Sequence, residues 1–209
     1  MNPSVAEVTN ALQDVRKAYR LLHDYQRAAL DASSYIGAHL GFRYAGGYSK
    51  FSECAPRDGR GALDNWAWDW LNLYFYDFHF VREQDGEEPV NLSIWLFSDT
   101  GYFVSKHPSP DETDIDTFAR AEDSGSKVGF IAYRQWTEDY DFIEDSEAVR
   151  TFLENNGQLP KLLHDAGIRA MVRDFSCLTC QDSTDILVSE LAEFLKSSGF
   201  GETIVKTIV

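Results

Sequence analysis

The chain has 209 residues, of which 44% are hydrophobic and 25% charged, and its 34 Asp and Glu against 19 Lys and Arg give a formal net charge of −15. Aromatic residues make up 14% of the chain and supply enough apolar surface for a core, which excludes disorder for most of the chain. Non-specific binding to nucleic acid or to an anionic membrane surface is excluded as well, because both would repel a protein of this charge. The same charge favours a basic protein partner.

The excess charge lies mainly in the second half of the chain. Residues 107–209 contain 20 acidic and 9 basic residues, whereas residues 1–106 contain 14 and 10. The three cysteines, Cys54, Cys177 and Cys180, are too few for a disulfide framework and suit a reducing compartment. Neither a signal peptide nor a membrane span is expected, so we predict a cytoplasmic protein.

The first forty residues predict one long helix, residues 1–40. Apolar or small residues recur from Val5 to Leu40 at alternating gaps of three and four positions, and Ser4 suits the start of the helix. This stripe favours packing against the protein's own sheet. A seam between two chains is the alternative. Gln26, Ala29 and Ser33 weaken it in the second half of the helix, and the flanking positions do not carry complementary charges. The protein is therefore expected to be a monomer or a homodimer.

The next segments predict a loop followed by a sheet. Residues 41–62 are rich in glycine and have the composition of a loop. Alternating residues then predict strands at 74–81, 92–97 and 102–105, joined by turns at Asp85-Gly86 and at Asp99-Thr100-Gly101, and a fourth strand at 127–136. Consecutive strands with tight turns form an antiparallel meander.

The C-terminal part alternates helix and strand. Helices are predicted at 146–155 and 160–165, a fifth strand at 168–175, and a last helix that begins at Asp182 or Ser183 and closes at Gly199. This order predicts an α+β fold: a single domain, 1–209, in which the long N-terminal helix and the C-terminal helices pack on a mostly antiparallel sheet of about five strands. Its parts are the helix 1–40, the β-meander region 63–136 and the helix-strand-helix region 143–209.

No complete catalytic set is present in the sequence. The histidines form no metal-ligand spacing, and no cofactor or metal is expected. Asp77 and His79 alternate along one strand and could point into a cleft together, so they are the candidate acid-base residues. Cys177 and Cys180 form a CxxC pair, but acidic neighbours and the missing partner ligands favour two buried thiols at the end of a strand over a redox or zinc site.

Two aromatic groups are candidates for binding. Trp66, Trp68 and Trp70 lie within five residues, and tryptophans so close together form either a core or a platform for a ligand. The second group mixes aromatic and acidic residues: Trp136, Asp139, Tyr140, Asp141, Glu144 and Asp145. We expect this second group to bind a basic partner, as in a non-catalytic immunity- or antitoxin-like inhibitor. The alternative is an enzyme or small-ligand binder with a pocket lined by the Trp66–His79 segment.

Overall fold

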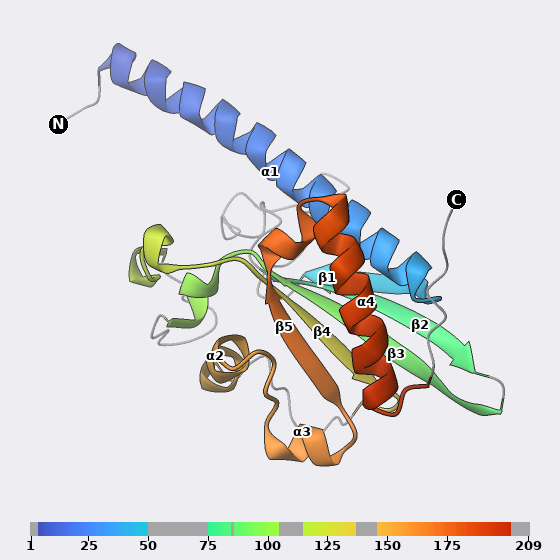
Figure 1. Ribbon diagram of the computed structural model, residues 1–209. Coiled ribbons are helices and arrows are strands. Elements are labelled where there is room, and N and C mark those ends of the chain that lie inside the picture. The colour runs from blue at the N-terminus through green and yellow to red at the C-terminus, as the bar shows by residue number, and fades with distance from the viewer. Residues whose placement is uncertain (1–3, 50–74, 85, 105–114, 137–145, 202–209) are drawn as a thin grey trace, which may run out of the picture.

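The computed structural model describes residues 4–49, 75–84, 86–104, 115–136 and 146–201 (Figure 1). Its helices and strands are, in chain order, α1 (Val5–His39), β1 (Arg43–Ser49), β2 (Phe75–Gln84), β3 (Glu87–Phe97), β4 (Lys127–Tyr133), α2 (Ser146–Glu154), α3 (Lys161–Asp165), β5 (Arg169–Asp174) and α4 (Gln181–Ser197). The described residues also form four short 3-10 helices: η2 (Thr100–Val104), η4 (Ile115–Thr117), η5 (Ala121–Asp123) and η7 (Phe175–Leu178). The long N-terminal helix, the C-terminal helices and the five-stranded antiparallel sheet confirm the predicted α+β fold.

Helix α1 begins where its sequence favours a start. The Ser4 hydroxyl accepts a hydrogen bond from the Glu7 backbone N–H at 3.3 Å, and the Glu7 carboxylate accepts one from the Ser4 N–H at 2.7 Å. This capping box satisfies two backbone donors of the first turn. Gly41 adopts φ +74° directly after the C-cap residue Leu40, a conformation that favours glycine.

The five strands form one sheet in the order β1-β2-β3-β4-β5, and every neighbouring pair is antiparallel. Each strand therefore pairs with the strand that follows it in the chain. The β2–β3 hairpin contains a register shift between Arg82 and Gln84. Beyond this shift His79 pairs with Ser93 and Asp77 pairs with Trp95.

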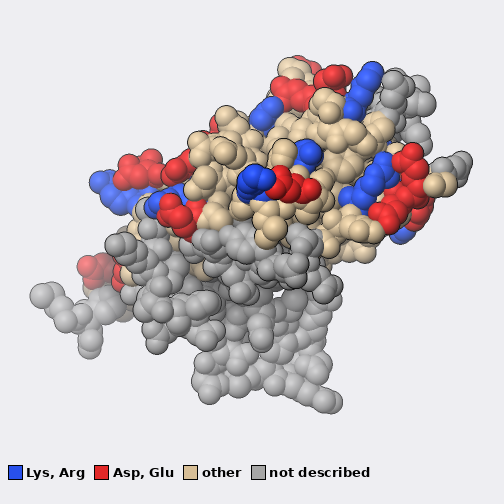
Figure 2. Space-filling model, turned by 90° about the horizontal axis from the view of Figure 1, so that it is seen from below, with Lys and Arg blue, Asp and Glu red and all other residues tan. Residues whose placement is uncertain are grey.

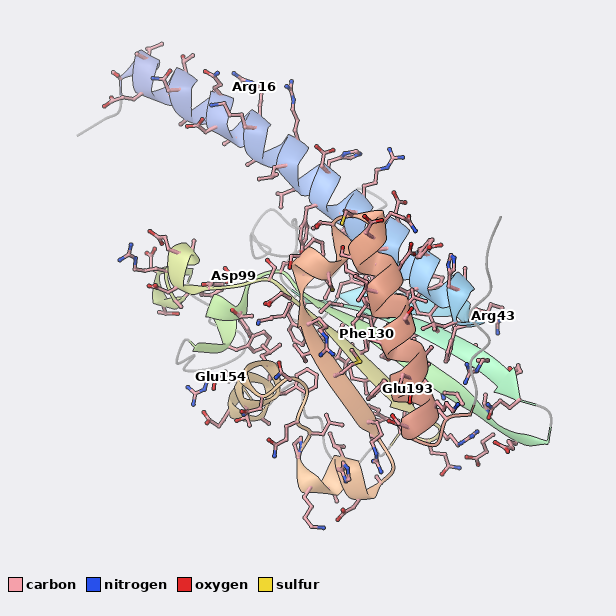
Figure 3. All side chains as sticks on the ribbon, viewed as in Figure 1. Arg16, Arg43, Asp99, Phe130, Glu154 and Glu193 are labelled. Carbon is pink, nitrogen blue, oxygen red and sulfur yellow. The ribbon has the colours of Figure 1, made fainter. Side chains whose placement is uncertain are left out.

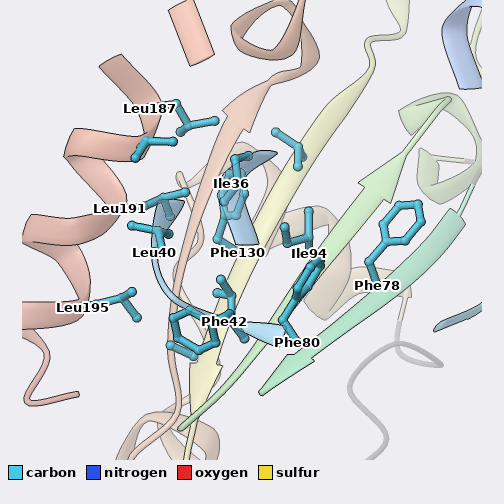
Figure 4. Close-up of a cluster of buried hydrophobic side chains, with 14 of the residues drawn as sticks. Ile36, Leu40, Phe42, Phe78, Phe80, Ile94, Phe130, Leu187, Leu191 and Leu195 are labelled. Atoms are coloured by element: carbon cyan, nitrogen blue, oxygen red, sulfur yellow. The ribbon is translucent and has the colours of Figure 1, made fainter. Parts of the chain in front are cut away.

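One face of the sheet packs against α4 and the C-terminal half of α1. Leu187, Leu191 and Leu195 of α4 and Ile36 and Leu40 of α1 are buried there. They cover strand residues that all point to this face: Phe78 and Phe80 of β2, Ile94 of β3 and Phe130 of β4 (Figure 4). This cluster is the larger of two hydrophobic cores.

The opposite face carries a second core built largely of aromatic rings. Phe75, Trp95 and Phe97 point from β2 and β3 to this face, and Phe152 of α2 is completely buried on them. The ring centroids of Trp95 and Phe152 lie 5.9 Å apart. Gly129 of β4 leaves room for the Phe152 ring, because a Cβ atom at this glycine would lie 3.3 Å from two ring carbons. Helix α2 thus packs closely on the sheet.

Two predicted segments were wrong. Residues 43–49, predicted as part of a loop, form the edge strand β1, because pairing with β2 stabilises a segment that contains two glycines. Residues 102–105, predicted as a strand, lie mostly in the 3-10 helix η2, where the neighbouring rings of Tyr102 and Phe103 are both buried in the second core. Strand pairing would have put these two rings on opposite faces of a sheet.

The N-terminal half of α1 extends beyond the rest of the molecule (Figure 1). Every residue from Ser4 to Asp24 is exposed. Contact with the sheet layers begins at Tyr25, whose ring centroid lies 4.6 Å from that of Phe175 and whose hydroxyl donates to Ser98 at 3.0 Å. The predicted packing of this helix on the sheet therefore holds only for its C-terminal half. Among the described residues, no helix combines the length and the hydropathy needed to cross a membrane.

Candidate functional site

A line of polar side chains lies on the sheet face that carries the second core. Asp77 and His79 both point to this face from β2, as their alternation predicts, and Ser93 stands opposite His79 on β3. The Asp77 Oδ2 and His79 Nε2 atoms are 3.2 Å apart, and the Ser93 hydroxyl lies 3.1 Å from His79 Nδ1. The two candidate acid-base residues are therefore in direct contact, and Ser93 extends the line across the strand pair.

Tyr133 of β4 continues this line toward the edge of the second core. Burial raises the pKa of the Tyr133 hydroxyl, a hydrogen bond with Ser93 offsets part of that rise, and the negative charge of Asp77 adds to it. Four side chains from three adjacent strands thus form one polar network, defined by Asp77, His79, Ser93 and Tyr133.

Trp136 lies at the end of this network. Its ring packs edge-on against Tyr133, with centroids 5.2 Å apart, and the residue is 37% exposed. The preceding residues hold it there: Arg134 donates to the Glu87 carboxylate at 2.8 Å, and its carbonyl accepts from Asn91 at 3.0 Å. These contacts connect the end of β4 to the β2–β3 hairpin. Trp136 is thus a partly exposed aromatic ring held in a defined position.

The network contains the three residue types of a nucleophilic triad, but its burial favours a different role. Ser93 is 2% exposed and Asp77 is 3% exposed, whereas the His79 side chain is 28% exposed. A serine nucleophile must be open to its substrate, and the Ser93 hydroxyl is closed in this conformation. His79 and Tyr133 are the members of the network that are partly exposed to solvent. The arrangement can relay a proton from His79 inward, and it fixes the position of Tyr133 under Trp136.

Several predicted site residues lie outside the described residues. They are Trp66, Trp68 and Trp70 of the tryptophan group and Asp139, Tyr140, Asp141, Glu144 and Asp145 of the acidic group. The last described residue before the acidic group is Trp136, and α2 begins directly after it at Ser146.

A separate cavity of about 500 Å³ lies between α1 and the strands β1 and β2. The rings of Tyr44, Phe78 and Phe80 line its sheet side, and Asp31 and Ser34 line its helix side. An apolar cavity of this size with a few polar groups is typical of a small-molecule site. Phe78 belongs to the aromatic segment for which a pocket was predicted.

The two cysteines of the CxxC pair are both free thiols, and the prediction that both are buried is wrong for Cys180, because this residue is exposed whereas Cys177 is partly buried. Burial raises the pKa of the Cys177 thiol to about 11. Cys180 is exposed at the start of α4, its sulfur lies 3.2 Å from the Ser183 hydroxyl, and this hydrogen bond holds the pKa of the Cys180 thiol below its ordinary value. Within the described part of the chain, no three His, Cys, Asp or Glu side chains gather as metal ligands would.

Comparison with known proteins identifies a family. A family model designated PM0109 matches residues 5–183. The chain belongs to the PM0109 family. The region shared with this family begins in the exposed half of α1, includes all five strands and Trp136, and ends in the first turn of α4. No curated protein and no solved structure matches the chain.

Sequence reasoning missed two members of the network, Ser93 and Tyr133. A signal for Ser93 was present, because alternation along β3 places this hydroxyl on the same face as Trp95 and Phe97, where a polar group needs a partner. Tyr133 carried no such signal, since an aromatic residue at the end of a strand is typical of a core. Tyr133 belongs to the site only because β4 pairs with β3, which brings its side chain next to Ser93.

Proposed function

We propose that the protein is a cytoplasmic, non-catalytic interaction protein that binds a basic protein partner, in the manner of an immunity- or antitoxin-like inhibitor. The observation that carries the proposal is the position of Trp136. Its partly exposed ring is held by Tyr133 and by the Arg134–Glu87 ion pair, and a run of acidic residues follows directly in the sequence. Partly exposed, well-supported tryptophans are common energetic centres of protein interfaces.

The distribution of charge supports the same proposal. Residues 107–114 and 137–145 contain eight acidic residues and no Lys or Arg. In the described part of the chain, by contrast, six basic side chains after position 106 pair with carboxylates: Arg120–Glu122, Lys127–Asp174, Arg134–Glu87, Arg150–Glu147, Lys161–Asp165 and Arg173–Glu190. Figure 2 likewise shows basic and acidic side chains next to each other on the described surface. The uncompensated charge belongs mainly to the two acidic segments.

A partner that binds here needs a basic surface with an apolar site for the indole ring. The acidic residues would speed encounter with such a surface, and their effect should weaken as salt screens the charges. The indole ring would supply contact energy that salt does not screen. The two contributions can therefore be separated by experiment.

The test is affinity capture from lysate of the native cell, with bound proteins identified by mass spectrometry at about 50 and 500 mM salt. Three variants are compared with the wild type: Trp136→Ala, a reversal of the four acids Asp139, Asp141, Glu144 and Asp145 to Lys, and a control reversal of Asp24, Asp123, Glu154 and Glu193. The control acids are exposed, and Glu154 and Glu193 lie on α2 and α4 (Figure 3).

We expect a basic protein that the wild type and the control retain at low salt and that the first two variants lose. A captured protein retained equally by all four chains would contradict the proposal. Retention that is unchanged at high salt would contradict the role of the acidic group.

The cavity between α1 and β1–β2 supports a second candidate function, binding of a small apolar or aromatic ligand. Its test uses the fluorescent probe anilinonaphthalene sulfonate, whose emission rises in apolar sites. Ser34→Trp places a large ring at the helix side of the cavity, and Ser189→Trp makes the same change on the exposed side of α4. Loss of probe binding in the Ser34 variant alone supports a ligand site, and equal binding in both variants excludes it.

A further inference from the structure

The exposed half of α1 carries an apolar stripe whose side chains remain largely open to solvent. Its six residues are Val5, Val8, Leu12, Val15, Tyr19 and Leu22, which are between 42% and 84% exposed. Figure 3 shows this half of the helix, labelled at Arg16, standing clear of the sheet and of α4. Large apolar side chains in a continuous row on a projecting helix mark an interaction site.

The spacing of the stripe identifies the kind of partner. The gaps between its members are three, four, three, four and three residues, which repeats every seven residues. A seven-residue apolar repeat matches the packing of a second helix with the same repeat, in which each side chain inserts between four residues of its neighbour. A helix of about twenty residues, roughly 30 Å long, gains little stability without such packing.

We propose that α1 is a self-association helix and that the stripe is covered by the stripe of a second copy of this chain, in antiparallel orientation. A second copy supplies a matching repeat of the same length. The flanking positions next to the stripe do not oppose the pairing, because Thr9, Ala11 and Ala18 are uncharged and Arg16 is the single charge among these four. This inference does not rest on the proposed basic partner, because the stripe and Trp136 are separate surfaces.

The fold determines the orientation. The same stripe continues toward Ile36 and Leu40, which pack on the protein's own sheet, and a seven-residue repeat turns it by only about 60° over three repeats. In a parallel pair, the helix of the second copy would therefore collide beyond Leu22 with the sheet on which α1 packs. An antiparallel partner places its own N-terminus beside Leu22, just before Tyr25 and the start of the packed layers. The two sheets then lie at opposite ends of the helix pair.

Side-chain volume favours the same orientation. Antiparallel pairing sets Val5 against Leu22, Val8 against Tyr19 and Leu12 against Val15, so every layer joins one valine to one larger residue. Parallel pairing would place Tyr19 against Tyr19 and Val8 against Val8, which alternates crowded and loose layers. Cores pack best when large and small residues face each other.

The first experiment measures the oligomeric state of the full chain by sedimentation equilibrium. The short helix pair lies at the small end of protein interfaces, so we expect a dimer with a dissociation constant in the micromolar range, roughly 1–100 μM. Leu12→Glu places a charge in the stripe and should weaken the dimer by about 100-fold or more. Leu21→Glu is the matched control, because Leu21 is 71% exposed on the same helix but lies outside the stripe.

The measured masses distinguish a dimer held by the stripe from a monomer. We expect twice the monomer mass of 23.7 kDa for the wild type and the control, and the monomer mass for Leu12→Glu. Because residues 12 and 21 lie outside both cores, circular dichroism should show an unchanged sheet in both variants. A wild type that stays monomeric at about 200 μM, or a dimer that resists Leu12→Glu, overturns the proposal.

Orientation is tested by disulfide crosslinking in a background with the native cysteines replaced by serine. Val5→Cys and Leu22→Cys are each expected to give little crosslinked dimer alone and to crosslink when the two proteins are mixed. Efficient crosslinking of Val5→Cys with itself would show a parallel pair and would overturn the antiparallel arrangement.

Discussion

Replacement of the buried Asp77 should destabilise the fold far more than the same replacement of an exposed aspartate in the same sheet. The Asp77 carboxylate is 4% exposed and lies 3.2 Å from His79 Nε2. Asp174, at the end of β5, forms an ion pair with Lys127 at 2.7 Å, but its side chain is 71% exposed. Asp77→Ala and Asp174→Ala thus remove the same group from a buried pair and from a surface pair.

The expected magnitudes follow from these environments. Loss of a hydrogen bond to a charged group costs about 1.5–3 kcal/mol, and the Asp77 replacement also leaves the inner side of His79 without its carboxylate partner. We therefore expect Asp77→Ala to lower the free energy of unfolding by about 2–3 kcal/mol. A surface ion pair contributes about 0–1 kcal/mol, so Asp174→Ala should cost less than about 1 kcal/mol.

Urea unfolding at pH 7.5, followed by far-ultraviolet circular dichroism, measures both values. With a denaturant slope of roughly 2 kcal/mol per molar, Asp77→Ala should move the midpoint down by about 1 M with the slope unchanged. In a double-mutant cycle, His79→Ala should cost much less in the Asp77→Ala background than in the wild type. Equal midpoints for the two aspartate variants, or additive effects of Asp77→Ala and His79→Ala, would refute the claim that the buried contact between Asp77 and His79 stabilises the fold.

Four further predictions concern the second core, a strained turn and the two cysteines. Phe152→Ala should lower the free energy of unfolding by about 3–5 kcal/mol in the same assay, because the ring is completely buried against the sheet. Gly157→Ala should lower the free energy of unfolding by more than about 2 kcal/mol, since φ is +96° and a Cβ atom would lie 2.6 Å from the backbone of Met171. Gly86→Ala is the control and should cost only about 1 kcal/mol, because φ is +77° and a Cβ atom there would lie in open space. Similar costs for the two variants would contradict the close approach of Gly157 to Met171. Iodoacetamide at pH 8 should alkylate Cys180 about 100-fold faster than Cys177, as judged by peptide mass spectrometry, and comparable rates would contradict the burial of Cys177. Because folding raises the pKa of the Cys177 thiol to about 11, its contribution to stability should be complete below pH 9 and lost as pH rises from about 9 to 11.

Long periodic patterns predicted the fold well, and short segments did not. The spacing from Val5 to Leu40 is regular over ten turns, so α1 was predicted with its start at the Ser4 cap. The pattern could not show that the helix leaves the sheet at Tyr25, because the spacing continues unbroken past that residue, and the half that contains Gln26 and Ser33 is the half that packs on the sheet. Strand β1 was not predicted, because its two glycines are typical of a loop and only its pairing with β2 makes the segment a strand.

The candidate site shows where sequence reasoning stops. Alternation placed Asp77 and His79 on one strand face. A regular hairpin around the Asp85-Gly86 turn would have set His79 opposite Leu92, because Gln84 pairs with Glu87. The register shift between Arg82 and Gln84 instead brings Ser93 opposite His79. A shift of one residue exchanges the two faces of a strand, and nothing in the local sequence requires it.

The binding proposal is tested most directly by the affinity of the purified chain for the basic protein recovered by capture, measured by isothermal titration calorimetry at two salt concentrations. We expect Trp136→Ala to weaken binding by about 30-fold or more, and a change from about 50 to 500 mM salt to weaken wild-type binding by at least about 10-fold. The control reversal of Asp24, Asp123, Glu154 and Glu193 should leave far more of the wild-type affinity than reversal of the acidic group does. Affinities that agree within twofold for the wild type and Trp136→Ala, with no dependence on salt, would contradict the proposal.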